Sequence, residues 1–264
     1  MPQPTISLII STYNWESALY LCLSSVLYQK VLPNEVIIAD DGSCERTREV
    51  VTFFQKKFPV PLHHVWQKDN GFQLAKIRNK AIKKVQFEYI IQVDGDVILD
   101  KNFIKDHLKF SKKNHFVRGS RTKIGSTLSQ KLLKEKIIHF SFFNSDINNR
   151  FNGFRNYYVA RLLSKPEQNS RKMLGCNMAY WREDALNING YENNLTGWGH
   201  EDEEFATRLI NNSIYKIKMK HYGFVKHIYH PERARDNEVE HNDLIQQVIS
   251  SNKKKATNGI NEIE

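Results

Sequence analysis

Cysteine is scarce in this sequence, and long apolar runs are missing from it. The 264 residues contain three cysteines, Cys22, Cys44 and Cys176, whose spacings match neither a zinc site nor a disulfide framework. No stretch approaches the ~20 apolar residues that a membrane-spanning helix needs. The first residues also lack the basic and then apolar pattern of a secretion signal. We therefore expect a cytoplasmic protein built as one large domain, or as one domain with an appendage.

Acidic residues are outnumbered by basic ones, and this imbalance limits the choice of partner. The chain has 39 Lys and Arg residues against 29 Asp and Glu residues, which gives a formal net charge of +10. Such a charge suits nucleic acid, an anionic membrane surface or a phosphate-rich small molecule. The sequence has no helix-turn-helix signature, RNP aromatic pair or zinc finger, so we expect no nucleic-acid partner. Charge does not choose between the membrane surface and the small molecule.

The first hundred residues alternate short β-rich runs with helical patterns. Strands that are joined by helices of this length predict an α/β fold with a mainly parallel sheet and helices on both faces. The expected strands are residues 6–10, 35–39, 61–66 and 87–93, and the expected helices include residues 45–58 and 74–85.

Acidic and amide side chains follow three of these strands. Because the carboxyl ends of parallel strands meet at one edge of a sheet, these side chains should converge at the edge where ligands bind. Carboxylates crowded together repel each other unless a cation or a donor-rich ligand offsets their charge. Each motif alone is also typical of a turn or a helix cap, but its repetition at successive strand ends favours a metal-bound nucleotide. The residues are Asn14, Asp40, Asp41, Asp94 and Asp96.

A second group of polar residues lies late in the sequence. Residues 197–204 place two glycines around Trp198, whose flat face suits a sugar, and then four acidic residues at the start of a helical pattern. Acidic residues in a first turn also suit the helix dipole, but that does not account for the Gly-Trp-Gly lead-in. His227 and His230 follow three residues apart, and imidazole with carboxylate oxygens can bind Mn²⁺. His227, at the end of an apparent strand, is the preferred ligand and His230 the reserve.

The middle of the sequence and its tail differ from the first hundred residues. Residues 119–172 are rich in Lys, Asn, Phe and Tyr and show no strand–helix alternation, although residues 131–143 can form a helix. The aromatic residues between positions 140 and 158 form either core or an amphipathic surface that meets a membrane or a lipid-linked acceptor. The tail from Ser250 is polar and basic, which predicts disorder.

Together these motifs resemble family 2 glycosyltransferases with the nucleotide-sugar-binding GT-A (Rossmann-like) fold. The resemblance covers roughly residues 5–232, and its late part is similar to a galactosyltransferase-type C-terminal module. It implies a nucleotide-sugar-binding half at 1–118, an irregular, partly helical acceptor-binding and catalytic half at 119–232, and a C-terminal helix with a disordered tail at 233–264. The motifs are Ser11-Thr12-Tyr13-Asn14, Ala39-Asp40-Asp41-Gly42-Ser43, Arg78-Asn79, Asp94-Gly95-Asp96, Gly175–Tyr180, Asn189-Gly190-Tyr191 and Gly197–Asp202.

The resemblance implies that the donor is a UDP-sugar. Asp40 or Asp41 would accept a hydrogen bond from the uracil ring, and Arg78 would lie near the donor sugar or its phosphates. Asp94 would contact the ribose or the sugar. The implied donor-site residues are Thr12, Tyr13, Asn14, Asp40, Asp41, Arg78, Asp94, Gly95 and Trp198.

The resemblance also implies the metal site and the catalytic groups. Asp96 and a histidine near position 227 would bind Mn²⁺ or Mg²⁺ across the diphosphate. Asp202 would be the general base, and Glu201 would position the acceptor. One base opposite the leaving group implies an inverting transfer of a hexose or N-acetylhexosamine. The implied acceptor is a glycan or a lipid-linked molecule in bacterial surface polysaccharide synthesis, and the enzyme would be cytoplasmic or peripheral on the inner face of the membrane.

Two other functions explain part of the sequence. A metal-dependent nucleotidyltransferase or phosphohydrolase also needs acidic strand ends and basic residues for phosphates. It would not need the segment Gly197–Asp202. A basic peripheral-membrane binding module explains the net charge but leaves the acidic strand ends without a role.

Overall fold

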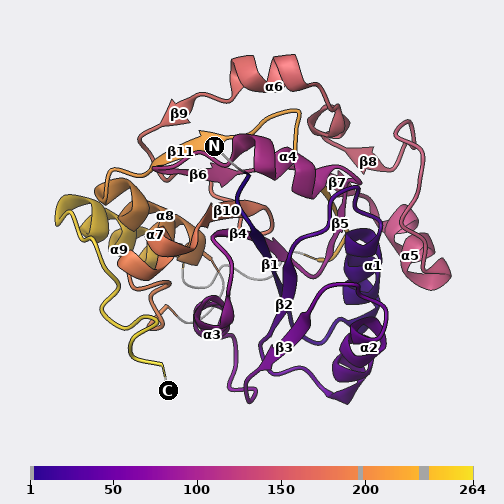
Figure 1. Cartoon of the computed structure of the whole chain (residues 1–264), viewed down its shortest axis with the longest axis horizontal. Coiled ribbons are helices and arrows are strands. Elements are labelled where there is room, and N and C mark those ends of the chain that lie inside the picture. The colour runs from indigo at the N-terminus through magenta and orange to yellow at the C-terminus, as the bar shows by residue number, and fades with distance from the viewer. Residues whose placement is uncertain (1–2, 196–198, 232–237, 264) are drawn as a thin grey trace.

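An eight-stranded mixed sheet forms the centre of the molecule (Figure 1). The structure, a computed structural model, describes residues 3–195, 199–231 and 238–263. The strand order is β3-β2-β1-β4-β10-β6-β11-β9, and the first four strands are parallel, as the sequence predicts. The antiparallel strand β10 joins this parallel half to the rest of the sheet. The strands are β1 (Ile6–Thr12), β2 (Glu35–Asp40), β3 (Leu62–Trp66), β4 (Tyr89–Asp94), β6 (His115–Arg118), β9 (Pro166–Glu167), β10 (Met178–Trp181) and β11 (Tyr215–Lys218).

A second, four-stranded sheet lies beside the carboxyl end of β4. Its order is β5-β12-β7-β8, and it brings strands from distant parts of the chain to one wall of the site. The strands are β5 (Val97–Leu99), β7 (Ser120–Ile124), β8 (Ile147–Asn148) and β12 (Phe224–His227).

Helices cover both faces of the main sheet, as predicted (Figure 1). Successive side chains of a strand point to opposite faces, so Leu8 and Ile10 pack with α1, α2 and α4, whereas Ile9 packs with α3, α7 and α8. The helices are α1 (Glu16–Leu27), α2 (Glu45–Gln55), α3 (Leu74–Lys84), α4 (Phe103–Phe110), α5 (Ser126–Glu135), η1 (Arg150–Gly153), α6 (Tyr157–Leu163), α7 (Arg182–Asn187), α8 (Glu201–Asn211) and α9 (Glu238–Ser250). Within the described residues, none of these helices is both long and apolar enough to cross a bilayer.

The middle of the chain is more regular than the sequence suggests. Residues 119–172 contain β7, α5, β8, α6 and β9. The predicted helix over 131–143 is wrong, because α5 starts at Ser126 and ends before Lys136, which adopts a left-handed conformation with φ of 55°. Asp146 fixes the start of α5 by accepting a hydrogen bond from the backbone N–H of Leu128 at 2.7 Å.

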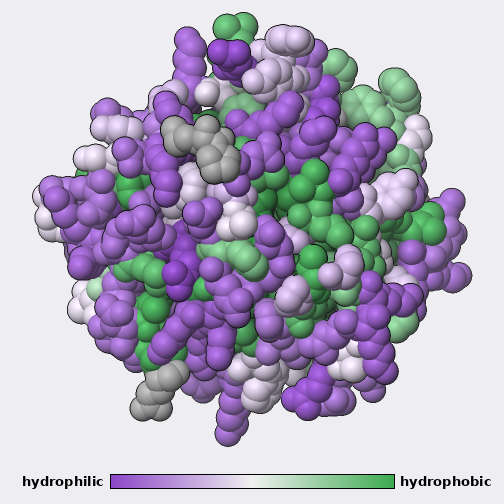
Figure 2. All heavy atoms as spheres, viewed as in Figure 1, coloured by the Kyte–Doolittle hydropathy of each residue, from purple (hydrophilic) through white to green (hydrophobic). Residues whose placement is uncertain are grey.

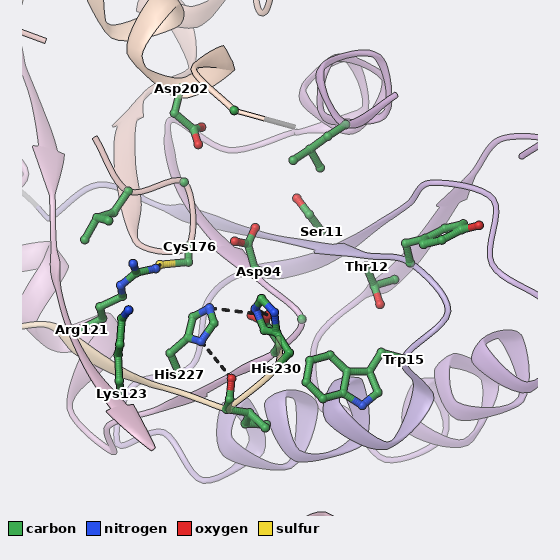
Figure 3. Close-up of a pocket in the computed structure, with 18 of the residues that line it drawn as sticks. Ser11, Thr12, Trp15, Asp94, Arg121, Lys123, Cys176, Asp202, His227 and His230 are labelled. Carbon is green, nitrogen blue, oxygen red and sulfur yellow. Dashed lines mark hydrogen bonds and ion pairs between the residues drawn. The ribbon is translucent and has the colours of Figure 1, made fainter. Parts of the chain in front are cut away.

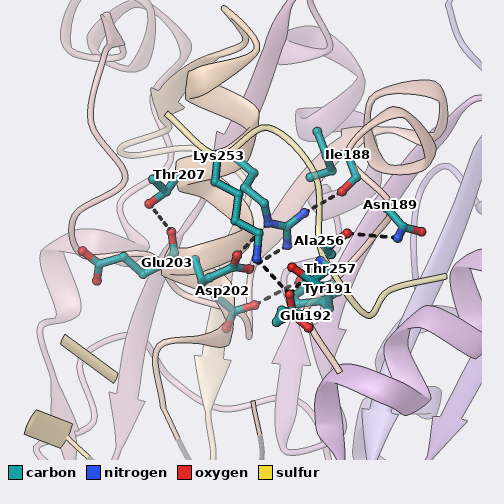
Figure 4. Close-up of polar contacts among 12 residues, drawn as sticks. Ile188, Asn189, Tyr191, Glu192, Asp202, Glu203, Thr207, Lys253, Ala256 and Thr257 are labelled. Atoms are coloured by element: carbon teal, nitrogen blue, oxygen red, sulfur yellow. Dashed lines mark hydrogen bonds and ion pairs between the residues drawn. The ribbon is translucent and has the colours of Figure 1, made fainter. Parts of the chain in front are cut away.

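The prediction that the tail from Ser250 is disordered is also wrong. Residues 251–263 pack against the segment after α7 (Figure 4). The backbone N–H of Ala256 donates to Ile188, Lys253 pairs with Glu192, and the Lys83 ammonium donates to the carbonyl of Ile263. The polar residues of the tail suggest a solvated chain, but their partners lie about 40 to 180 positions away in the sequence, where a local pattern cannot show them.

Candidate active site

A cavity of about 1320 Å³ opens at the carboxyl ends of β1 and β4 (Figure 3). Its wall comes from the end of β1, the turn after β4, strands β7 and β8, residues 172–176, the start of α8 and residues 227–231. The cavity contains most of the residues that the sequence assigns to the site. Those in its wall are Thr12, Tyr13, Asn14, Asp41, Arg78, Asp94, Gly95, Asp96, Glu201, Asp202 and His227.

Asp40 and Asp41 are neighbours with different environments. Asp41 lies in the cavity wall, where its carboxylate accepts hydrogen bonds from Gln67 and the backbone of Gln73, and burial raises its pKa. Asp40 lies outside the wall and accepts hydrogen bonds from His64, at 2.8 Å, and from the backbone N–H of Ser43. Of the two residues, only Asp41 is therefore placed to meet a ligand.

Gly95 allows the turn after β4 to lie against β1. Its backbone N–H donates to the carbonyl of Ser11 at 2.7 Å. A Cβ at this position would lie 3.1 Å from that carbonyl oxygen and 3.2 Å from Thr12 Oγ1. The glycine thus keeps the two sides of the predicted donor site in contact.

Asp96, His227 and His230 form a group that fits a divalent cation. Figure 3 shows the two histidines of this group side by side. One potential ligand atom from each residue lies within 4.8 Å of the others, and Asp96 Oδ2 is 3.5 Å from His227 Nε2 and 3.3 Å from His230 Nε2. Each Nδ1 faces a backbone carbonyl at 2.8–2.9 Å, an arrangement that orients Nε2 as the ligand atom. Asp96 Oδ1 is buried and has no hydrogen-bond partner within the described residues.

The protonation states of this group suit a metal site. Burial lowers the pKa of His227, which favours the neutral imidazole that binds metals. Burial alone would raise the pKa of Asp96, but His230 and His227 outweigh it and lower that pKa. The structure places His230 in the group as well as His227, so both histidines become candidate ligands.

Arg78 connects the acidic turn after β4 to the start of α8. Its guanidinium lies 3.1 Å from Asp94 Oδ1, 3.0 Å from Asp202 Oδ1 and 3.3 Å from Glu201 Oε1. Burial disfavours its charge, but these carboxylates raise the pKa of Arg78 well above its usual value. Burial raises the pKa of Asp94 to about 6 despite the opposing arginine. Arg78 therefore holds carboxylates from two parts of the chain in fixed positions.

Asp202 is oriented by Tyr191 and Gly175, which belong to the sequence motifs, and by Gln92, which the sequence did not single out. Its Oδ1 accepts hydrogen bonds from Tyr191 Oη at 3.1 Å and from Gln92 Nε2 at 3.4 Å. Gly175 lies against the other oxygen, and a Cβ there would come 2.0 Å from Asp202 Oδ2. The carboxylate is thus fixed on one side while its residue lines the cavity.

Glu201 lies beside Asp202 in a less solvated position. Burial raises the pKa of Glu201 to about 7, and the charge of Asp202 adds to this effect. Glu201 Oε2 is buried without a hydrogen-bond partner among the described residues. Trp198, which the sequence places next to these residues, lies outside the described part of the chain.

Arg121, Lys123 and Lys172 also line the cavity, although sequence reasoning missed them. In β7 the basic residues alternate with the buried Thr122 and Ile124, which is the period of a strand. That alternation was the available signal. Arg121 donates to Cys176 Sγ at 3.7 Å. Figure 3 shows Arg121 and Lys123 on the far side of His227 from Thr12 and Trp15.

Comparison with known proteins shows which family this chain belongs to. The model of glycosyl transferase family 2 matches residues 7–183, which is more than half of the chain. The chain belongs to glycosyl transferase family 2. A second family model, described as the N-terminal domain of galactosyltransferase, matches residues 155–231 and includes the starts of α8 and β12. The family that the sequence motifs resemble is thereby confirmed.

Two bacterial chondroitin synthases are among the similar sequences. The chain is 28% identical over 229 residues to chondroitin synthase of Escherichia coli and 25% identical over 230 residues to chondroitin synthase of Pasteurella multocida. Each alignment covers 80% of this chain, but it covers only 33% and 23% of those relatives, respectively. The chain thus spans a third or less of their length.

Solved structures share the fold at low sequence identity. A mannosyltransferase from Pyrobaculum calidifontis, solved with GDP-Man and Mn²⁺, matches 95% of this chain and 65% of its own with a TM-score of 0.63 and 16% identity. Staphylococcus aureus TarS 1–349 in complex with UDP matches 94% of this chain and 65% of its own, with a TM-score of 0.59 and 20% identity. The fold is the GT-A fold that the sequence predicts.

Proposed function

We propose that this family 2 glycosyltransferase is a metal-dependent, inverting enzyme that uses a UDP-sugar. The observation that carries the proposal is one cavity that contains both the Asp96–His227–His230 group and the Asp202 carboxylate. A site for a leaving diphosphate and a base for an attacking hydroxyl are the two parts that sugar transfer from a nucleotide requires.

The donor is proposed to bind along the carboxyl ends of β1 and β4. The nucleoside would lie against Thr12, Tyr13 and Asn14, and Asp41 would accept a hydrogen bond from uracil. The Tyr13 hydroxyl donates to Asp69 at 2.9 Å, a contact that orients this ring in the wall. TarS, which shares the fold, has been solved with UDP, and the mannosyltransferase from P. calidifontis with GDP-Man and Mn²⁺.

Asp96, His227 and His230 would hold the divalent cation, Mn²⁺ or Mg²⁺. The fit rests on the buried Asp96 Oδ1, which has no partner among the described residues, and on the orientation of both imidazoles. Two imidazoles favour Mn²⁺ over Mg²⁺, because Mg²⁺ prefers oxygen ligands. When bound, the cation supplies charge stabilisation to the departing diphosphate.

Asp202 would accept the proton of the acceptor hydroxyl. Arg78 and Tyr191 hold its Oδ1, so the carboxylate would meet the hydroxyl in one fixed orientation. Glu201, the adjacent residue on the first turn of α8, would position the acceptor. Attack assisted by a single base opposite the leaving group would invert the anomeric centre of a transferred hexose or N-acetylhexosamine.

The acceptor is proposed to be a glycan or a lipid-linked molecule of a bacterial surface polysaccharide. The similar chondroitin synthases and the poly(ribitol-phosphate) β-N-acetylglucosaminyltransferase TarS carry names of polymer-building enzymes. The three cysteines are free thiols, which suits a cytoplasmic site of action.

The test is release of UDP from a panel of UDP-sugars with and without Mn²⁺, for the wild type and Asp96→Ala. We expect one donor to turn over, with a dependence on Mn²⁺ that the variant loses. Glu135→Ala, a change of an exposed carboxylate on α5, is the matched control and should keep the dependence. Unchanged Mn²⁺ dependence in Asp96→Ala would refute the metal site.

A parallel thermal-shift measurement with UDP and Mn²⁺ separates a missing acceptor from a missing donor site. If neither UDP nor any UDP-sugar raises the melting temperature, the uridine assignment is wrong. Release of phosphate or pyrophosphate in place of UDP would favour the nucleotidyltransferase or phosphohydrolase alternative.

A further inference from the structure

Large apolar side chains are exposed together on the segments just before and after β8. Tyr158 is 82% exposed, Phe143 81% and Phe151 76%, whereas the exposed aromatic residues outside positions 142–158 are spread along the described chain. We call these residues and their neighbours the aromatic face. It consists of Phe142, Phe143, Phe151, Phe154, Tyr157, Tyr158, Leu162 and Leu163. Contiguous exposed apolar surface is uncommon in soluble proteins and marks a site of interaction.

Short contacts join neighbouring parts of the aromatic face, and its segment is anchored to the body. Phe142 contacts Phe143, Tyr157 contacts Tyr158, and a Cβ at Gly153 would lie 3.7 Å from the ring of Phe142. Arg155 anchors the segment through the buried carboxylate of Asp106, with contacts of 2.8 and 2.6 Å. Helix α6 buries only Ala160, and η1 buries none of its residues. The apolar side chains therefore point outward from an ordered support.

Basic side chains outnumber acidic ones on the segment that carries the aromatic face. Residues 136–165 contain five basic side chains and one acidic side chain, Asp146, whose carboxylate is occupied by the backbone of α5. Figure 2 shows apolar atoms along the upper rim of the molecule, over α6 and towards β8, mixed with hydrophilic ones. The basic residues are Lys136, Arg150, Arg155, Arg161 and Lys165.

We propose that the aromatic face docks the protein on an anionic lipid bilayer. Aromatic and leucine side chains at the headgroup boundary, with Lys and Arg beside them, are the combination by which amphipathic helices bind such surfaces. A second copy of the chain is a poor occupant, because its own aromatic face would bring like charges together. The net charge of +10 supports attraction to the same surface.

The position of the aromatic face also determines where the active-site cavity of a docked enzyme would lie relative to the membrane. Asn148 on β8 lines the active-site cavity, and η1 begins two residues later. Docking would therefore hold the cavity beside the headgroups, where the accepting hydroxyl of a lipid-linked molecule would lie. This last step rests on the proposed transferase function, whereas the docking itself does not.

Co-sedimentation with vesicles tests the proposal without donor, metal or acceptor. We expect the wild type to pellet with phosphatidylglycerol–phosphatidylcholine vesicles, to pellet less at high salt, and to stay in solution with pure phosphatidylcholine. Arg161→Gln with Lys165→Gln should weaken binding by ~5-fold for each charge. The control pair, Lys56→Gln with Lys255→Gln, removes two exposed charges elsewhere and should lose less.

A second pair of variants tests whether the apolar side chains contribute to vesicle binding. Leu162→Ser changes a residue of the aromatic face, and Ile249→Ser changes a half-exposed residue on α9. Only the first should lower vesicle binding, while both keep the wild-type melting temperature. Equal binding of all variants, or no binding of the wild type, overturns the proposal. A third outcome would also overturn the proposal: the wild type forms dimers, Leu162→Ser dissociates them, and neither protein binds vesicles. The aromatic face would then be a protein–protein contact.

Discussion

The two oxygens of Asp202 have different surroundings, and this difference underlies the role proposed for the residue. Oδ1 is held by Arg78, Tyr191 and Gln92, so the orientation of the carboxylate does not depend on a bound ligand. A base that is held in place before the substrate binds loses little conformational entropy during the reaction. Substitution of Asp202 should therefore affect the chemical step more than binding of the nucleotide.

Asp202→Asn is expected to lower the rate of sugar transfer by about 10²–10⁴, because general-base catalysis contributes this much. The asparagine keeps the size of the side chain and an acceptor oxygen for Arg78, so affinity for UDP should be retained. The measurements are UDP release under saturating donor and UDP binding by calorimetry. Glu183→Gln, an acidic residue in the first turn of α7, is the control. An equal loss of UDP affinity in Asp202→Asn would place Asp202 in the donor site instead.

Glu201 should make the metal-free protein less stable as the pH rises. Its pKa is raised from an ordinary 4.5 to about 7, so between these values the folded state holds a proton that the unfolded state has lost. The free energy of unfolding then falls with increasing pH over this range, and it stays lower above it. Glu201→Gln carries no titrating group at this position. Its melting temperature should therefore fall less than that of the wild type between about pH 5 and about pH 8. Parallel melting curves would contradict the raised pKa.

At the scale of elements, local patterns predicted the strands that bring the polar residues of the cavity together. The buried runs of β1, β2 and β4 are long enough to be read from sequence, and their parallel order brings their polar ends together. Which of Asp40 and Asp41 faces the cavity could not be read, because it depends on His64 in the neighbouring strand β3. Strand β7 was missed because two of its buried residues, Ser120 and Thr122, are polar, so the alternation with its basic residues is weak.

The loop of residues 172–176 illustrates a contact between elements that the sequence motif cannot show. Gly175 faces Asp202 at the start of α8, and its missing Cβ leaves space for the carboxylate. Gly175→Ala should push the carboxylate aside and lower kcat by up to about 10²-fold, with UDP affinity retained. Ser126→Ala, which changes an exposed residue of the same cavity, should leave kcat near the wild-type value. An unchanged kcat in Gly175→Ala would mean that the loop does not constrain the base.

At the scale of the whole molecule, the C-terminal tail completes one of the two large cores. Ile260 is buried among residues of α3, α7 and α8, and the backbone of Asn189 bonds to Ile260. Asn193 contacts Asn258 in the tail and Asn79 in α3, the residue next to Arg78. The tail therefore supports the helix that carries the central arginine of the site, from a position that sequence reasoning assigned to disorder.

Two isoleucine substitutions decide between a packed and a disordered tail. Ile260→Ala removes a side chain that is 5% exposed and should lower the free energy of unfolding by about 2–5 kcal/mol. Ile249→Ala removes the same atoms from a position on α9 that is 48% exposed and should change it by no more than about 0.5 kcal/mol. Urea denaturation measures both, with equal slopes required for the comparison. If the two variants are equally stable, the Ile260 side chain is not packed in a core, and the tail is disordered as its composition predicts.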